Sequence, residues 1–237
     1  AFIRNTSHQG AMGYYPLMAA EKGMAGIAFV CSPPMMVPYG ARVAGVDNSP
    51  LAISVPAKSH PPLILDMATS VAAMGKVTLA VDKGVPIPEG WALDRDGNST
   101  TDPRQVAALL PFGGPKGSGL ALMFECLSSL IVSNPLLESI LLGHKRNEGH
   151  QIQNSVVVAI DIGTFTDLEN YKEHIDNLID GLKALPKAEG STEILVPGAP
   201  ENRTYDDRYR NGIPLPQGTI NRLLSVADRL GIHFPAK

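Results

Sequence analysis

The stretch GGPKGSG, residues 113–119, places four glycines, a proline and a lysine directly ahead of an apolar run. Gly114 and Gly117 allow tight turns that bring backbone N–H groups close to a ligand, and a helix start carries partial positive charge. Lys116 adds a full positive charge, so the cluster suits an anion such as a phosphate. The same residues could form a turn that lets an apolar helix pack closely, and both interpretations stay open.

Two familiar phosphate-binding motifs do not match this cluster. A P-loop carries its lysine after the last glycine and before Ser or Thr, whereas Lys116 precedes Gly117. A Rossmann fingerprint follows a strand directly, whereas residues 102–110 (DPRQVAALL) predict a short helix ahead of the cluster. If the cluster is an anion site, it is therefore of another kind, and we expect the following helix to begin near Ser118.

One histidine and one aspartate are further candidates for chemistry. His8 lies in the polar turn NTSHQG ahead of a helix, where an imidazole can exchange a proton at neutral pH. A surface or helix-capping role for His8 is the alternative. Asp66 ends an apolar strand and opens a helix, so we expect it to cap that helix, to contact a ligand, or both. The other histidines show no metal-ligand spacing, and no metal site is expected.

Composition excludes several classes of protein. Of the 237 residues 44% are hydrophobic and 18% charged, with a formal net charge of −3, which indicates a globular protein without a basic surface for nucleic acid or anionic membrane. The longest apolar run, about residues 119–132, is too short to span a bilayer. Cys31 and Cys126 have no metal or redox spacing, so we expect reduced thiols in a cytoplasmic protein.

The elements that must position these residues alternate between helix and strand, which predicts a mixed α/β fold. Prolines exclude a helix from residues 33–62, and DRDG at 94–97 predicts a hairpin. Thr166 and Glu169 form a capping box for an amphipathic helix. Further helices are expected over 14–23, after Asp66 and over about 219–230, and strands over 26–31, 51–56, 155–163 and near 193–197, followed by a polar, Pro-flanked segment at 198–214. No repeat or linker divides the chain, so residues 1–237 are expected to form one unit.

Six segments, taken together and in order, resemble the malate/L-lactate dehydrogenase-type family of NAD(P)-dependent oxidoreductases, which is distinct from the Rossmann-fold lactate and malate dehydrogenases. The segments are SHQGAMGYY, SPPMMVPYG, LDMATSVAAMGKV, IPEGWALDRDGNSTTDP, ALLPFGGPKGSGLALMFECLS and VPGAPE. Within the family, the wording of these segments is most similar to ureidoglycolate dehydrogenase.

The resemblance implies a role for each matching residue. His8 matches the family's active-site histidine, which would exchange a proton with the substrate hydroxyl during hydride transfer. Asn48 falls at a substrate-facing position, where VDNSP replaces the usual GTNP. The positions that would contact the cofactor are Ser32, Asp66, Met67, Ala68, Gly114, Lys116, Gly117, Gly198 and Glu201.

The implied activity is hydride transfer between a nicotinamide cofactor, NAD or NADP with NAD slightly favoured, and a small 2-hydroxy acid or 2-oxo acid such as malate, lactate or ureidoglycolate. Two alternatives stay open: a cyclic imino acid (piperideine- or pyrroline-2-carboxylate) reductase, and a truncated, non-catalytic dimeric relative. The resemblance also implies the family's mixed-sheet fold and a homodimer. It places a dinucleotide-binding region at about residues 25–200, with the chain ends packing on an N-terminal helical region that precedes residue 1 in the family.

Overall fold

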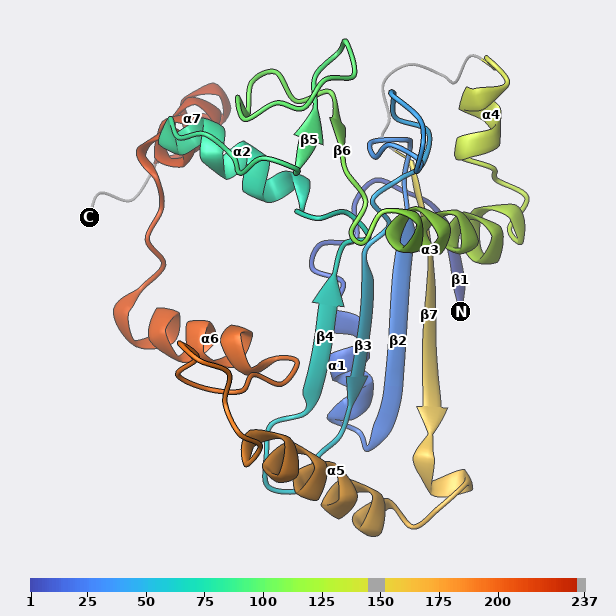
Figure 1. The fold of residues 1–237 in the computed structure, drawn as a ribbon, viewed down its shortest axis with the longest axis vertical. Coiled ribbons are helices and arrows are strands. Elements are labelled where there is room, and N and C mark those ends of the chain that lie inside the picture. Colours follow the sequence, from blue (N-terminus) through green and yellow to red (C-terminus); the bar gives the residue numbers. More distant parts are fainter. Residues whose placement is uncertain (145–151, 234–237) are drawn as a thin grey trace.

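A five-stranded sheet organises the chain in the computed structural model, which describes residues 1–144 and 152–233 (Figure 1). All neighbouring strands are antiparallel. Their order across the sheet is β1 (Phe2–Thr6), β7 (Gln153–Asp161), β2 (Met24–Cys31), β3 (Leu51–Val55) and β4 (Leu63–Met67). This antiparallel sheet with flanking helices confirms the predicted mixed α/β fold and differs from the parallel sheet of a Rossmann fold.

Alternating side chains of β2 divide the sheet into two faces. Ala28 and Val30 are buried on one face beneath α1 (Tyr14–Ala20), which lies behind the sheet in Figure 1. The approach of α1 depends on Gly26, because a Cβ at that position would lie only 2.5 Å from the Cα of Pro16. The absence of a side chain at Gly26 therefore sets how closely α1 packs on β2.

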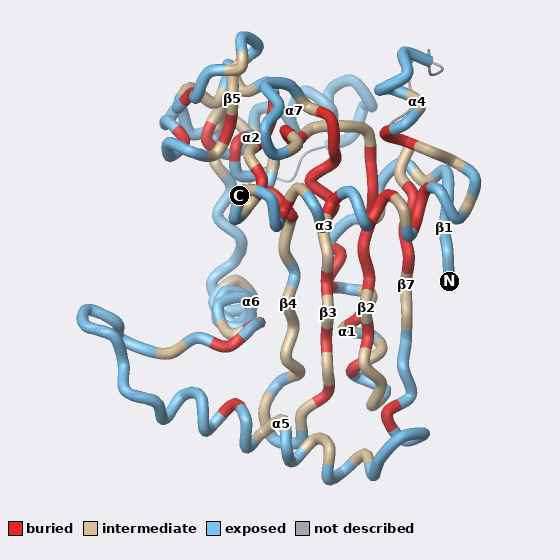
Figure 2. Tube along the Cα trace, turned by 45° about the vertical axis from the view of Figure 1, so that its right-hand side comes forward, coloured by how far each residue is buried: buried red, intermediate tan, exposed pale blue. Residues whose placement is uncertain are grey.

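On the other face, β2 packs against α3 (Pro115–Glu125), which crosses the upper end of the strands in Figure 1. The ring of Phe124 stacks on Phe29 with centroids 4.5 Å apart. A π-helical turn, Cys126–Leu130, continues α3. The buried residues of the strands gather toward this end of the sheet (Figure 2), so the glycine cluster that begins α3 lies beside the best-packed part of the core.

A second cluster of buried apolar residues lies beyond this end of the sheet. It involves α2 (Met74–Lys83) and the two-stranded ribbon of β5 (Ala92–Leu93) and β6 (Ala108–Leu109). α7 (Gln217–Leu230) packs beside α2, where Asp82 accepts hydrogen bonds from Arg222 (Nη1, 2.8 Å) and Thr219 (Oγ1, 2.9 Å). These bonds attach the last helix to the middle of the chain.

Three further helices lie at the periphery. α4 (Leu137–Leu141) follows the π-helical turn, α5 (Leu168–Lys183) crosses the lower end of the sheet, and α6 (Ala199–Asn211) lies to the side of β4 (Figure 1). A short 3₁₀ turn, Ile162–Thr164, connects β7 to α5. Among the described residues, no helix is both long enough and apolar enough to cross a membrane.

The structure differs from the local predictions in several places, for tertiary or capping reasons. Residues 102–110 form a turn and β6 instead of a helix, because their backbone hydrogen-bonds to the neighbouring strand β5. The N–H of Ala107, for example, donates to Leu93 O at 2.8 Å. Residues 193–197 contact β4 through one long bond, Ile64 N to Pro197 O at 3.4 Å, and form no strand. The polar segment after Gly198 contains α6. Asp167, rather than Thr166, caps α5 by accepting from Asn170 N at 2.8 Å.

Candidate active site

His8 lies on the exposed turn between β1 and α1. Its Nδ1 accepts a hydrogen bond from Gly10 N at 2.8 Å. The hydroxyl of Tyr15 donates to Gln9 O at 2.6 Å, and the Gln9 amide bonds Thr6 on β1. The turn is therefore fixed at both ends, and because Nδ1 accepts, the proton of the neutral imidazole lies on Nε2, on the opposite edge of the ring.

Asp66 connects this turn to the edge of the sheet. Its Oδ2 accepts from Gly13 N at 2.7 Å, at the start of α1. The contact requires a glycine, since a Cβ on Gly13 would lie 2.8 Å from that oxygen. The prediction that Asp66 caps the helix following it was wrong: Asp66 lies within β4, paired with Ala52, and Ala73 precedes α2 without a side-chain cap. The ladder with β3 continues to Met67, so the carboxylate serves α1 instead.

The segment after Asp66 meets the glycine cluster. Met67 ends β4, Ala68 follows it half-buried, and Thr69 is fully buried. Phe112 N donates to Thr69 O at 3.0 Å, and a Cβ on Gly117 would lie only 2.3 Å from the same carbonyl oxygen. The structure thus places Gly117 against Thr69, the residue that follows Met67 and Ala68, and the glycine at 117 is what permits the contact.

The glycine cluster folds back on itself before α3. Gly113 and Gly114 have φ angles of 54° and 60°, in the left-handed half of the map that glycine tolerates. This turn lets the N–H groups of residues 116, 117 and 118 donate to the carbonyls of residues 113, 112 and 114 at 3.0–3.3 Å. Those N–H groups are therefore engaged, contrary to the expectation that they are free for a ligand. The helix also begins at Pro115, three residues before the predicted Ser118.

Lys116 is the free cation of this region. It is exposed in the first turn of α3, and across residues 1–144 and 152–233 its ammonium group has no hydrogen-bond or ion-pair partner. The neighbouring Tyr39 lies against Gly114, 3.2 Å from the position of a Cβ there, and its backbone N donates to Ser118 Oγ at 3.1 Å. At this loop the side chain of Lys116 is therefore more available to an anion than the backbone N–H groups of residues 116–118.

Ser32 and Asn48 are held together by a buried carboxylate that the sequence analysis missed. Asp47 is 1% exposed, and it accepts from the Ser32 hydroxyl at 2.7 Å, from Ser32 N at 2.9 Å and from Ser49 N at 3.1 Å. Burial raises the pKa of Asp47, and the hydrogen bonds from Ser32 and Ser49 oppose that rise. The only signal in the sequence was the acidic residue in VDNSP.

Asn48 contributes its backbone to the same end of the sheet. Its carbonyl accepts from Thr69 N at 2.7 Å, so the loop carrying Ser32 and Asn48 is joined to the segment of Met67 and Ala68. Both Ser32 and Asn48 are buried, 6% and 8% exposed. Together with the glycine cluster, these loops form one continuous set of contacts.

Gly198 and Glu201 lie on the other side of β4. Gly198, with φ of 90°, precedes α6, and a Cβ there would lie 2.7 Å from Ile64 Cγ2. Glu201 is exposed in the first turn of α6. An open groove of about 310 Å³ runs along this edge of the sheet, with Asp66, Gly198 and Glu201 in its walls. The structure therefore brings these three predicted site residues together.

The two cysteines give no second reactive site. Burial raises the pKa of Cys31 to about 12, so its thiol stays protonated. Cys126 is half-buried at the start of the π-helical turn and, like Cys31, unpaired. No group of three or more His, Cys, Asp or Glu side chains in the described ranges is arranged to hold a metal ion.

Comparison with known proteins identifies the family. A sequence model described as malate/L-lactate dehydrogenase matches residues 1–224. The chain belongs to this family. It is 37% identical to a malate dehydrogenase of Pyrococcus horikoshii over 97% of this chain and 66% of that protein. It is 32% identical to the ureidoglycolate dehydrogenase (NAD(+)) of Escherichia coli K12, over 95% of this chain and 64% of that enzyme.

The solved structures agree with the family assignment. The malate dehydrogenase of Entamoeba histolytica superimposes with a TM-score of 0.88 at 26% identity, covering 99% of this chain and 69% of that one. The chain spans about 66% of the length of the first curated family members it matches.

Proposed function

We propose that this chain is part of an NAD(P)-dependent oxidoreductase that interconverts a small 2-hydroxy acid and the corresponding 2-oxo acid. Malate, lactate and ureidoglycolate are the candidate 2-hydroxy acids. The observation that carries the proposal is the 2.7 Å hydrogen bond between Asp66 Oδ2 and Gly13 N. It holds the turn with the proton-exchanging candidate His8 against the strand that leads into the cofactor-binding candidates.

The residues present fit a nicotinamide dinucleotide, which supplies or takes up the hydride in such reactions. Lys116 offers a phosphate an ammonium group that has no partner among the described residues. Asp66 and Glu201 place carboxylates in one groove, where they can accept hydrogen bonds from ribose hydroxyls. Because the Ser32 hydroxyl donates to Asp47, its oxygen is left to accept an N–H from the ligand, such as that of a carboxamide.

His8 would move the proton. In the neutral ring Nε2 carries the proton, because Nδ1 accepts from Gly10 N. To release a proton from Nε2 as an acid, the ring must first take up a second proton at Nδ1, which then faces the Gly10 N–H. We therefore infer that the ring turns away from Gly10 when it is charged, and that its exposed position allows this movement.

The oligomeric state and location complete the proposal. α3 and the π-helical turn carry a row of large apolar side chains that are about half exposed: Leu122, Met123, Leu127, Leu130 and Ile131. A surface of this kind supports a homodimer. The two unpaired thiols support a reducing, cytoplasmic location.

Steady-state kinetics with NADH and NADPH against a panel of 2-oxo acids and a cyclic imine, Δ1-piperideine-2-carboxylate, test this function. We expect His8→Asn to lower kcat by about 10²–10⁴-fold while leaving the dinucleotide Kd unchanged. His174→Asn, on the exposed surface of α5, is the matched control and should behave as wild type. An unchanged kcat in His8→Asn would overturn the assigned role, and turnover of the imine alone would make the chain an imino acid reductase.

A further inference from the structure

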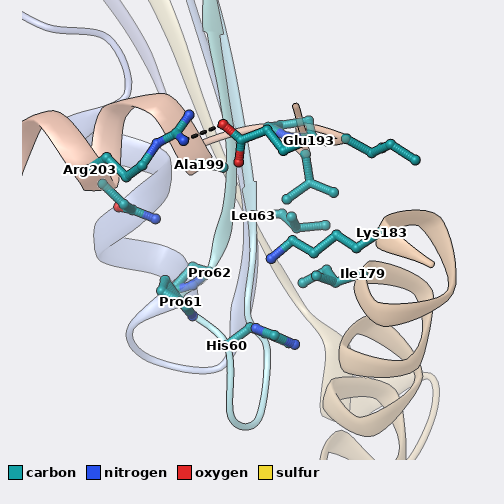
Figure 3. A pocket seen from close by; sticks show the side chains of 13 residues that line it. His60, Pro61, Pro62, Leu63, Ile179, Lys183, Glu193, Ala199 and Arg203 are labelled. Carbon is teal, nitrogen blue, oxygen red and sulfur yellow. Dashed lines mark hydrogen bonds and ion pairs between the residues drawn. The ribbon is translucent and has the colours of Figure 1, made fainter. Parts of the chain in front are cut away.

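A second cavity lies beside the groove of Asp66 and Glu201, between the start of β4, the end of α5 and the start of α6 (Figure 3). Its volume is about 240 Å³. Most of its lining is apolar, including Pro61, Pro62, Leu63, Ile179 and Val196. Ile179 is only 2% exposed, so this wall is a packed part of the fold. Apolar walls of this kind suit an apolar or aromatic ring.

Among the charged side chains around the cavity, one cation has no partner within the described residues. Arg203 is paired with Glu193, and the Nε2 of His60 lies 2.8 Å from Asp180. Lys183, in the last turn of α5, has no hydrogen-bond or ion-pair partner in the part of the chain that the structure describes. Figure 3 shows its side chain reaching from α5 into the cavity beside Leu63 and Ile179. The cavity therefore combines apolar walls with a single available ammonium group.

This cavity and the groove share a wall. Val196 and Pro197 line both, and α6 begins directly after them at Ala199. Asn202 faces the cavity and Glu201 the groove. A ligand lying in the groove with its ribose against Asp66 and Glu201 can thus extend past this shared wall into the cavity.

We propose that the cavity receives the adenosine end of the dinucleotide and that Lys183 binds a phosphate on its 2′-oxygen, so that this chain uses NADP in preference to NAD. The inference rests on the proposed function for the identity of the dinucleotide. A purine fits the apolar walls, and a phosphate dianion is the natural partner for an unpaired ammonium group. A 2′-hydroxyl would leave Lys183 unused.

Calorimetric titration with NADPH, NADH and adenosine 2′-monophosphate tests the proposal on wild type, Lys183→Ala and Lys187→Ala. Lys187 is the matched control, because its Nζ donates to Thr192 O at 2.8 Å and it lies outside the cavity lining. We expect Lys183→Ala to weaken NADPH and adenosine 2′-monophosphate by about tenfold or more, the scale of one charged hydrogen bond. NADH binding should not change, and Lys187→Ala should bind all three ligands as wild type does.

The outcomes separate the two proposals. Equal affinity of wild type for NADH and NADPH, or equal loss of both in Lys183→Ala, overturns the 2′-phosphate site while the oxidoreductase function stands. If neither dinucleotide binds, the proposed function fails. The titration with adenosine 2′-monophosphate then tests the 2′-phosphate site on its own. Binding that depends on Lys183 supports the site, and no binding overturns it.

Discussion

Both carboxylate oxygens of Asp47 accept a hydrogen bond from Ser32: Oδ2 accepts its backbone N–H at 2.9 Å and Oδ1 its hydroxyl at 2.7 Å. The bidentate contact fixes the loop after β2 and determines the polarity of Ser32, whose oxygen can only accept further hydrogen bonds. A buried acid in this place is an uncommon way to hold a site loop, because ionised carboxylates are costly to bury.

Asp47 should give the protein an unusual response to acid. Because burial raises its pKa above the ordinary value of 3.8, the folded state binds this proton more tightly than the unfolded state. The free energy of unfolding should therefore rise as the pH falls from the raised native pKa toward 3.8, and this contribution should be level below that. Urea unfolding of wild type and Asp47→Asn at a series of pH values measures this contribution, as the pH dependence of the difference between their unfolding free energies.

Asp47→Asn should lack this contribution, because an amide group does not titrate in this range. A pH dependence that is the same in wild type and Asp47→Asn would show that another group carries the effect.

Two glycines of α3 form a matched pair for testing the contact with the segment after β4. In Gly117→Ala the new methyl group would lie 2.3 Å from Thr69 O, and we expect a loss of about 1–3 kcal/mol or more. Gly119 has nothing within 4 Å of its Cβ position, so Gly119→Ala should stabilise α3 by about 0.5–1 kcal/mol. Thermal unfolding of both variants tests this difference in stability, and equal melting temperatures would contradict the close contact between Gly117 and Thr69.

Lys116 should act in binding rather than in the chemical step. Lys116→Ala removes the ammonium group beside the glycine turn, and we expect the dinucleotide KM to rise by about tenfold or more with kcat nearly unchanged. Lys76, an exposed lysine of α2, is a suitable control position. A fall in kcat without a change in KM would place Lys116 at the reacting atoms instead.

Asp66 should position the His8 turn through Gly13. Asp66→Ala loses the acceptor, and we expect a loss of about 0.5–2 kcal/mol of stability, as for a helix cap, together with a lower kcat. Asp66→Asn keeps an oxygen that can accept from Gly13 N, so it should recover most of the kcat of wild type. If both variants show the same kinetic defect, the carboxylate charge matters rather than the hydrogen bond.

Local patterns in the sequence predicted the elements that are self-contained. α1, β2, β3, β7 and α7 follow from hydrophobic periodicity and turn residues, and the hairpin at 94–97 follows from its Asp-Gly turn. Helix α6 was missed because its residues are almost all polar, and its described part contains no buried residue. β6 was missed because β5 and neighbouring loops, rather than local propensity, bind its backbone.

The site was only partly visible in the sequence for the same reason. The glycine cluster and His8 could be picked out as residue types, but the partner of Asp66 is a backbone N–H 53 residues away in sequence. The role of Asp47 depends on the burial of its carboxylate, and a single acidic residue among small residues in the sequence does not indicate burial. The cavity of Lys183 is lined by three separate stretches of chain, and only the folded chain brings them together.

The position of β7 between β1 and β2 has a consequence for how the chain acquires its structure. Phe29 pairs with Val156, so the centre of the sheet joins residues that are 127 positions apart in the sequence. Until β7 has been synthesised, the backbone N–H and C=O groups on one edge of the apolar strand β2 lack their partner strand. Long-range pairing of this kind makes refolding slow and the waiting edge prone to association with other chains. The strand that completes the sheet therefore also sets the interval during which a growing chain needs protection.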